Sequence, residues 1–278
     1  GKTRSWPVVT AAALSLPQQI TVTHGLQAIV ANCLAHIRGN EAGVAHGNNA
    51  EGIHQMRVGL RRLNSALGLF RERLRCPQKV LADETLAGIP RADIETDGVM
   101  SLRQAISARV YQNSLLVQEA VMSARYRECL LNLEHWVAGL DKDASDTALS
   151  GFAQQVLPQL RERLRKRGSK LVKGNPKQRH RARMAAKKVR YATEFFRAWY
   201  SPAEVRAYLN ALAILQDALG WLNDAAVAED LLSRLAREQP ELAHSVGFVQ
   251  GYLTAHSRRR IRRLGKLWER FQQLPVPT

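Results

Sequence analysis

Basic side chains recur with helical spacing in two short segments of this sequence. Residues 54–62 are HQMRVGLRR and residues 180–188 are HRARMAAKK, so both fit the pattern HxxRxxx[RK][RK]. The two segments lie 126 positions apart, and an aromatic residue follows each at the same distance, Phe70 and Phe196. Such an internal match indicates that a structural unit of about half the chain is duplicated.

On a helix, each copy would place its basic residues on one side. At about 100° per residue, the cations lie within about 80° of the histidine, and the apolar side chains lie on the opposite face. Arginine can donate two parallel hydrogen bonds to a phosphate, whereas lysine supplies a compact charge, so a helical row of both suits a linear polyanion. The candidate anion ligands are His54, Arg57, Arg61 and Arg62 in the first copy, and His180, Arg183, Lys187, Lys188 and Arg190 in the second.

A third basic row is expected near the carboxyl end. Arg259, Arg262, Arg263 and Lys266 fall on one side of a predicted helix, away from Leu264. A single charged face is ordinary for a surface helix, but residues 161–190 hold 14 basic side chains and one acid, Glu162. Solvent-facing helices normally mix the two signs, so an anionic ligand is the better explanation. Secondary candidates for contact with this ligand are Arg163, Lys166, Lys170 and Arg109.

The overall charge predicts a polyanionic partner. The 278 residues carry a formal net charge of +17, and residues 151–278 supply +15 of it. Nucleic acid, an anionic membrane surface and a phosphate polymer are the usual partners of such chains. A basic membrane-binding helix needs Trp or Phe beside its cations, and single-strand nucleic-acid binders interleave aromatic residues with them. The basic rows lack both features, and membrane insertion is not expected.

The sequence offers no catalytic constellation. It has no Walker loop, no GxSxG and no paired acids beside an evident nucleophile, so neither an enzyme nor a cofactor is expected. His54 and His180 have no second ligand at metal spacing, which favours phosphate binding over a metal site. Asn223 and Asp224 could be catalytic, but Asp224 is expected to orient a cation in a buried ion pair. Core packing is the expected role of the tryptophans Trp136, Trp221 and Trp268.

Hydrophobic periodicity predicts a helical chain. We expect an all-α fold of two pseudo-symmetric four-helix bundles, with residues 1–17 as a leader or linker and the halves at 18–146 and 147–278. Cys33, Cys76 and Cys129 form no CxxC pair, and we see no signal peptide, which together predict a reducing, cytoplasmic location. The helices are expected at 18–38, 51–75, 78–88, 99–139, 148–171, 177–199, 202–237 and 241–273.

The chain resembles the CHAD domain, the conserved histidine α-helical domain, over nearly its whole length after the leader. The resemblance rests on EGIHQMRVGLRRLNSALGLF, ARYRECLLNLEHW, HRARMAAKKVRYATEFF and LQDALGWLNDAAVAEDLL. It implies one helical domain with a central basic groove or pore that binds inorganic polyphosphate, and association with polyphosphate granules. It also suggests an N-terminal CYTH domain in the full-length protein. Nucleic acid is the alternative partner.

Two positions depart from the family pattern. Asn64 occupies the first-copy position that matches Arg190, which removes one cation from that row. The family's glycine followed by Arg-Asp is represented only by residues 86–93, where Pro90 interrupts helical periodicity. The first-half ligands therefore follow less directly from the family pattern than those of the second half.

Overall fold

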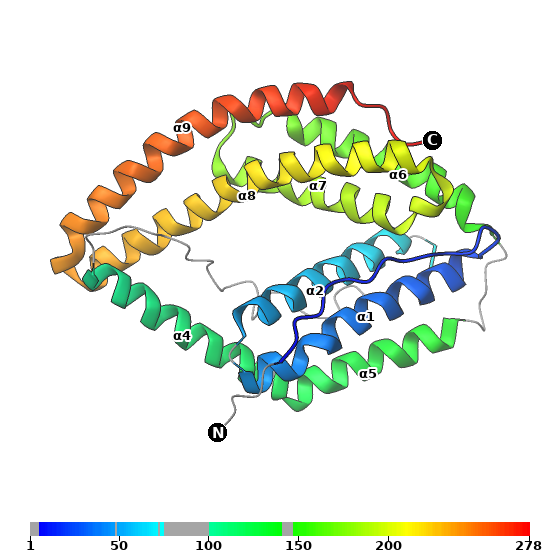
Figure 1. Cartoon of the computed structure of the whole chain (residues 1–278), viewed down its shortest axis with the longest axis horizontal. Coiled ribbons are helices and arrows are strands. Elements are labelled where there is room, and N and C mark those ends of the chain that lie inside the picture. Colours follow the sequence, from blue (N-terminus) through cyan, green and yellow to red (C-terminus); the bar gives the residue numbers. More distant parts are fainter. Residues whose placement is uncertain (1–5, 48, 72, 75–99, 141–146) are drawn as a thin grey trace. The chain divides into compact units, whose positions relative to one another are not determined.

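The computed structural model describes residues 6–47, 49–71, 73–74, 100–140 and 147–278. Within these ranges the chain is helical apart from turns, short extended segments and one isolated bridge, Thr21–Ala148, which confirms the all-α fold class. The helices are α1 (Val22–Gly47), α2 (Ala50–Phe70), α4 (Met100–Met122), α5 (Ala124–Ala138), α6 (Leu149–Gly168), α7 (Pro176–Phe195), η2 (Arg197–Trp199), α8 (Pro202–Glu238), η3 (Pro240–Leu242) and α9 (Ala243–Gln273) (Figure 1).

Helix α1 continues through Gly39, where the sequence predicted a stop. A Cβ atom on Gly39 would lie 2.9 Å from the side chain of Val9. Asn40 holds the same segment, because its Oδ1 accepts from the Val9 amide at 3.1 Å and its Nδ2 donates to the Val9 carbonyl at 2.8 Å. Gly39 is therefore a close-packing position and not a helix cap. Residues 6–17, the described part of the predicted leader or linker, pack along α1.

The predicted helix at 99–139 is two helices in the structure. Ser123 separates α4 from α5 and caps α5, since its Oγ accepts from the Tyr126 amide at 3.2 Å. The Ser123 hydroxyl also donates to the Ala120 carbonyl at 2.7 Å and so satisfies a backbone group at the end of α4. No proline or glycine marks this break, which is why hydrophobic periodicity alone did not reveal it.

Two compact units make up the described chain. The first contains residues 6–74, 112–140, 147–157 and 191–200, with residues 48 and 72 outside the described part, and the second contains 100–111, 158–190 and 201–278. Each unit draws on both halves of the sequence, so the predicted boundary at 146/147 does not coincide with the division between them. The expected helix at 78–88, Cys76 and the segment 86–93 lie outside the described residues.

The core of the first unit joins the aromatic residues that follow the two copies of the repeated pattern. Phe70 and Phe196 are both completely buried, with ring centroids 6.3 Å apart. Phe152 packs against both rings, at 4.9 Å from Phe70 and 6.1 Å from Phe196. These three aromatic rings form part of the buried apolar core of this unit.

The core of the second unit anchors α9 at both of its ends. Val246, Val249 and Leu253 pack with the carboxyl-terminal part of α8. Nearer its own carboxyl terminus, α9 buries Trp268, and a Cβ atom on Gly168 of α6 would lie 2.1 Å from that indole ring. Arg161 of α6 caps α9 by donating to the Phe271 carbonyl at 2.9 Å. The middle of α9 is left to carry exposed side chains.

Among the described residues, every helix is too short or too polar to cross a lipid bilayer.

Two glycines of α2 test how closely α1 and α2 pack. A Cβ atom on Gly59 would lie 2.7 Å from the buried Ile37 side chain of α1, whereas Gly68 has nothing within 4 Å. We expect Gly59→Ala to lower the free energy of unfolding by about 1–3 kcal/mol through overpacking. Gly68→Ala is the matched control and should be neutral or stabilising by up to about 1 kcal/mol, because alanine favours a helix. Thermal unfolding followed by circular dichroism measures both; equal midpoints would contradict the close approach.

Candidate anion-binding site

The basic row of α7 is supported by neutral residues of α8. His180 Nδ1 lies 2.8 Å from Asn223 Oδ1, and Arg190 Nη1 donates to Gln216 Oε1 at 3.3 Å. Between these two contacts, the Cβ position of Gly220 is 3.9 Å from Arg183 Nε. The two helices therefore run antiparallel, with Gln216, Gly220 and Asn223 on one face of α8. The sequence left Gln216 without a role, although its spacing to Gly220 and Asn223 is that of one helical face.

The contact with Asn223 fixes the orientation of the His180 ring. An amide oxygen only accepts hydrogen bonds, so His180 Nδ1 carries a hydrogen in this arrangement. Nε2 is then the ring atom available to a ligand, and it can donate to an anion when the ring is protonated. Asn223 Nδ2 in turn donates to Asp224 Oδ1 at 3.3 Å. Asp224 is exposed, which differs from the buried ion pair that we expected.

The remaining cations of α7 differ in their exposure. Arg183, Lys187 and Arg190 are half-buried, whereas Lys188 is exposed. On the other side of the helix, Ala182 and Val189 are completely buried, as the sequence predicted. Half-burial removes part of the hydration of a charge, so an anion that meets these cations is screened less than it would be on an open surface.

The first copy of the pattern lies on α2, and one of its cations is buried while the others are half-buried. His54, Arg57 and Arg61 are half-buried. Arg62 is only 7% exposed, and its guanidinium bonds Glu194 Oε2 at 3.2 Å and Asn32 Oδ1 at 3.1 Å.

The guanidinium of Arg62 also lies over the ring of Phe195, 5.4 Å from the centroid. Burial raises the pKa of the nearby Cys33 thiol to about 11 even though Arg62 opposes that shift, so this region is poorly hydrated. The structure therefore gives Arg62 a packing role, in place of the ligand role predicted from the sequence. Its counterpart in the second copy, Lys188, is exposed, so the two copies share a positive charge at this position but not its environment.

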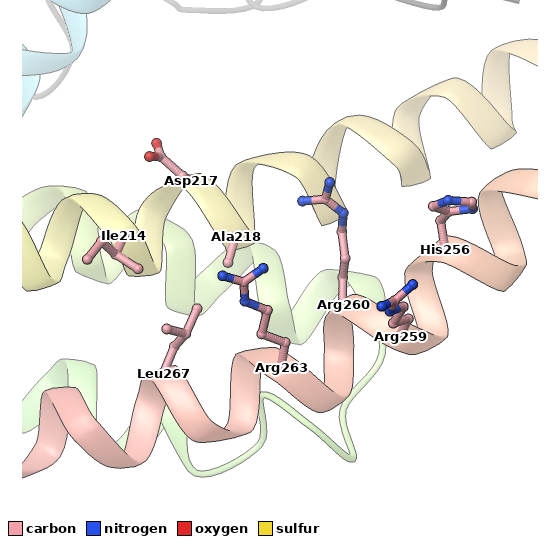
Figure 2. Close-up of a pocket in the computed structure, with 8 residues that line it drawn as sticks. All are labelled: Ile214, Asp217, Ala218, His256, Arg259, Arg260, Arg263 and Leu267. Atoms are coloured by element: carbon pink, nitrogen blue, oxygen red, sulfur yellow. The ribbon is translucent and has the colours of Figure 1, made fainter.

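The basic row of α9 lines one side of a cavity of about 520 Å³. Arg259, Arg260 and Arg263 reach it together with His256 and Leu267, and α8 supplies the other side (Figure 2). Arg260 was not predicted; its guanidinium stacks over the Trp221 ring at 4.3 Å. The residues from α8 are Ile214, Asp217 and Ala218.

The two other predicted cations of α9, Arg262 and Lys266, are exposed but do not line this cavity. Of the predicted row, Arg259 and Arg263 line the cavity, and Arg260, which was not predicted, lines it as well.

The secondary candidates lie on α6, in the turn that follows it, and on α4. Arg163, Lys166 and Lys170 are exposed, and Lys166 Nζ is 3.9 Å from the Glu162 carboxylate. Arg109 belongs to α4, and its side chain lies outside the part of the chain that the structure describes.

The structure also locates the residues for which the sequence left alternatives. No group of three or more His, Cys, Asp or Glu side chains suited to a metal ion occurs among the described residues, and neither histidine of the pattern belongs to one. Trp268 is buried, as predicted, whereas Trp136 and Trp221 are half-buried.

Comparisons with known proteins agree with this architecture. A family model described as the CHAD domain matches residues 28–92 and 78–233. A solved structure, the crystal structure of the CHAD domain from the plant Ricinus communis, is 33% identical to this chain. That match covers 98% of this chain and 99% of the plant chain, with a TM-score of 0.89. No curated protein sequence matches the chain.

The burial of Arg62 predicts a stability effect that the exposed cations lack. Arg62→Ala removes one partner of a part-buried ion pair and leaves Glu194 and Asn32 without its hydrogen bonds, so it should lower the free energy of unfolding by about 2–4 kcal/mol. The control Arg262→Ala removes an exposed cation and should change it by no more than about 0.5 kcal/mol. Chemical denaturation measures both variants. If Arg62→Ala unfolds like the wild type, Arg62 does not have the packing role assigned to it.

Proposed function

Because this chain belongs to the CHAD family, we propose that it binds inorganic polyphosphate and catalyses no reaction on it. The observation that carries the proposal is the row of His180, Arg183, Lys187 and Arg190 on α7, in which His180 and Arg190 contact neutral amides of α8. A ligand with one negative charge on each of many linked phosphates is the natural counterpart.

The spacing of the α7 row suits a linear ligand. A helix rises about 1.5 Å per residue, so the row from residue 180 to residue 190 spans about 15 Å. Cations recur along it at intervals of three or four residues, which places them on one face. Phosphates spaced along an extended chain can therefore meet the cations of this row in turn. A compact single phosphate would use only part of this row.

Two further basic surfaces extend the proposed interaction. His54, Arg57 and Arg61, from the first copy of the pattern, are half-buried on α2. Arg259, Arg262, Arg263 and Lys266 form the exposed row on α9. Binding to several such surfaces would increase avidity for long chains over short ones. Retention of the protein at polyphosphate granules in the cytoplasm would follow from this binding.

A double substitution on α7 tests the site. Arg183→Ala with Lys187→Ala should weaken binding to long-chain polyphosphate on the order of tenfold or more, because two charge-assisted contacts are lost. The charge-matched control, Arg125→Ala with Arg206→Ala, removes two exposed cations from α5 and α8 and should have a small effect. Isothermal titration calorimetry gives the affinities, and circular dichroism checks the fold. Equal losses in the two double variants would mean that net charge, and not this row, governs binding.

The salt dependence should report how many cations take part. Neutralising a phosphate releases counter-ions, and on nucleic acids each such contact contributes about 0.7–0.9 to the slope of log affinity against log salt. The α7 double variant should therefore have a slope shallower by about 1.5 than the wild type. Fluorescence titrations at several salt concentrations measure this change. An unchanged slope would exclude Arg183 and Lys187 from the contact.

A competition at fixed salt distinguishes polyphosphate from nucleic acid. Labelled long-chain polyphosphate is displaced by unlabelled polyphosphate, duplex DNA or tRNA at equal phosphate concentration. Polyphosphate should be the strongest competitor, because its charges are more closely spaced than those of a nucleic acid and no bases separate them. If DNA or tRNA displaces the label more effectively, the protein is a nucleic-acid binder and the proposal is wrong.

A further inference from the structure

Exposed aromatic side chains precede the basic row on α9. Phe248 is 68% exposed and is the most exposed large hydrophobic side chain among the described residues, and Tyr252, one turn later, is 51% exposed. Positions four apart lie on the same face of a helix. Large aromatic groups left in water forgo the stabilisation that burial would give, so a pair of them on one face marks a surface that contacts another molecule.

This aromatic face continues into the cavity through His256. The rings of Tyr252 and His256 stack with centroids 4.0 Å apart and an interplanar angle of 30°. His256 Nδ1 lies 3.1 Å from the Tyr252 carbonyl oxygen, which holds the imidazole in this position. His256 also lines the cavity beside Arg259 (Figure 2). The aromatic residues and the cavity therefore form one continuous surface along α9.

The cavity end of this surface is suited to phosphate. Arg259, Arg260 and Arg263 provide three guanidinium groups within little more than one helical turn. Trp221 covers one face of the Arg260 guanidinium at 4.3 Å, and stacking of this kind leaves the in-plane N–H donors directed outward. The one carboxylate that lines the cavity, Asp217, points away from these guanidinium groups (Figure 2). Three cations and one acid give the cavity a positive charge.

The order of the side chains along α9 restricts the class of ligand that can bind there. The aromatic residues occupy one end and the cations the other, and the rise per residue puts Tyr252 about 12 Å from Arg260 and about 16 Å from Arg263 along the axis. A single-stranded nucleic acid alternates bases with phosphates and calls for aromatic and basic residues interleaved along the strand. The segregated order matches one base followed by several consecutive phosphates.

We infer that this face of α9 binds a nucleoside triphosphate, with its base against Tyr252 and Phe248 and its phosphates at Arg259, Arg260 and Arg263. The inference rests on the proposed function in one respect, since it assigns Arg259 and Arg263 to phosphate in both cases. It goes beyond that function because Phe248 and Tyr252 add recognition of a base, which inorganic polyphosphate lacks.

The test compares ATP with inorganic tripolyphosphate, which has the same number of phosphates and no base. Titration calorimetry of the whole chain, in low salt without divalent cations, should give about tenfold tighter binding of ATP, as base stacking on an aromatic ring provides. Tyr252→Ala should weaken ATP binding about tenfold and leave tripolyphosphate binding unchanged. Tyr252→Phe should retain the preference for ATP, because the ring and not the hydroxyl stacks. Val227→Ala, an exposed apolar position on α8, is the control and should change neither affinity.

Each contrary result has a distinct meaning. If ATP and tripolyphosphate bind equally and Tyr252→Ala affects neither, base recognition is wrong, while the polyphosphate proposal stands provided that long chains still bind. If long-chain polyphosphate binds but ATP does not, the inference is likewise overturned. If none of the phosphate ligands binds, both proposals fail. If light scattering shows a dimer that Phe248→Ala converts to a monomer, with no effect on ATP binding, the aromatic face serves self-association and the inference is wrong.

Discussion

Repulsion between like charges on α7 is the constraint on which the candidate site depends. Cations three or four residues apart destabilise an isolated helix by a few tenths of a kcal/mol per pair. This helix is kept in place by tertiary packing on its other face, where Ala182 and Val189 are completely buried. On its neighbour α8, Asn223 contacts His180, Gln216 accepts a hydrogen bond from Arg190, and Gly220 faces Arg183.

Three arginines stack on aromatic rings but differ in their exposure to solvent. Arg62 lies over Phe195 and is neutralised by Glu194, and Arg161 lies 4.0 Å from the centroid of Phe271 and caps the end of α9. Burial lowers the pKa of Arg161, as expected where water is excluded. Arg260 stacks in the same way on Trp221, but it is exposed and lines a cavity with two other arginines. Stacking is common to all three, and access to solvent distinguishes the third.

The helix α9 both packs against the core of its unit and presents aromatic and basic side chains to solvent. Its two ends are held by apolar contacts, with Val246 and Val249 at one end and Trp268 and Phe271 at the other. Because buried side chains fix the helix, its outward face can present aromatic and basic side chains to solvent. Rigid elements hold ligand-binding groups more accurately than loops do. The same reasoning applies to α7, whose row is held from behind by buried alanines.

The sequence by itself determined the helical class and the apolar faces, because these follow from local periodicity. It also revealed the family, through the duplicated basic pattern and the segment that contains Asn223. The continuation of α1 through Gly39 and the burial of Arg62 depend on tertiary contacts, which local spacing does not contain. The break at Ser123 is made by local capping hydrogen bonds, which hydrophobic periodicity does not report. Arg62 and Lys188 occupy equivalent positions of the pattern, yet one faces Glu194 in a core and the other faces solvent. Only the tertiary structure could decide between these environments, because the burial of a charge depends on what packs against its helix and not on the helix itself.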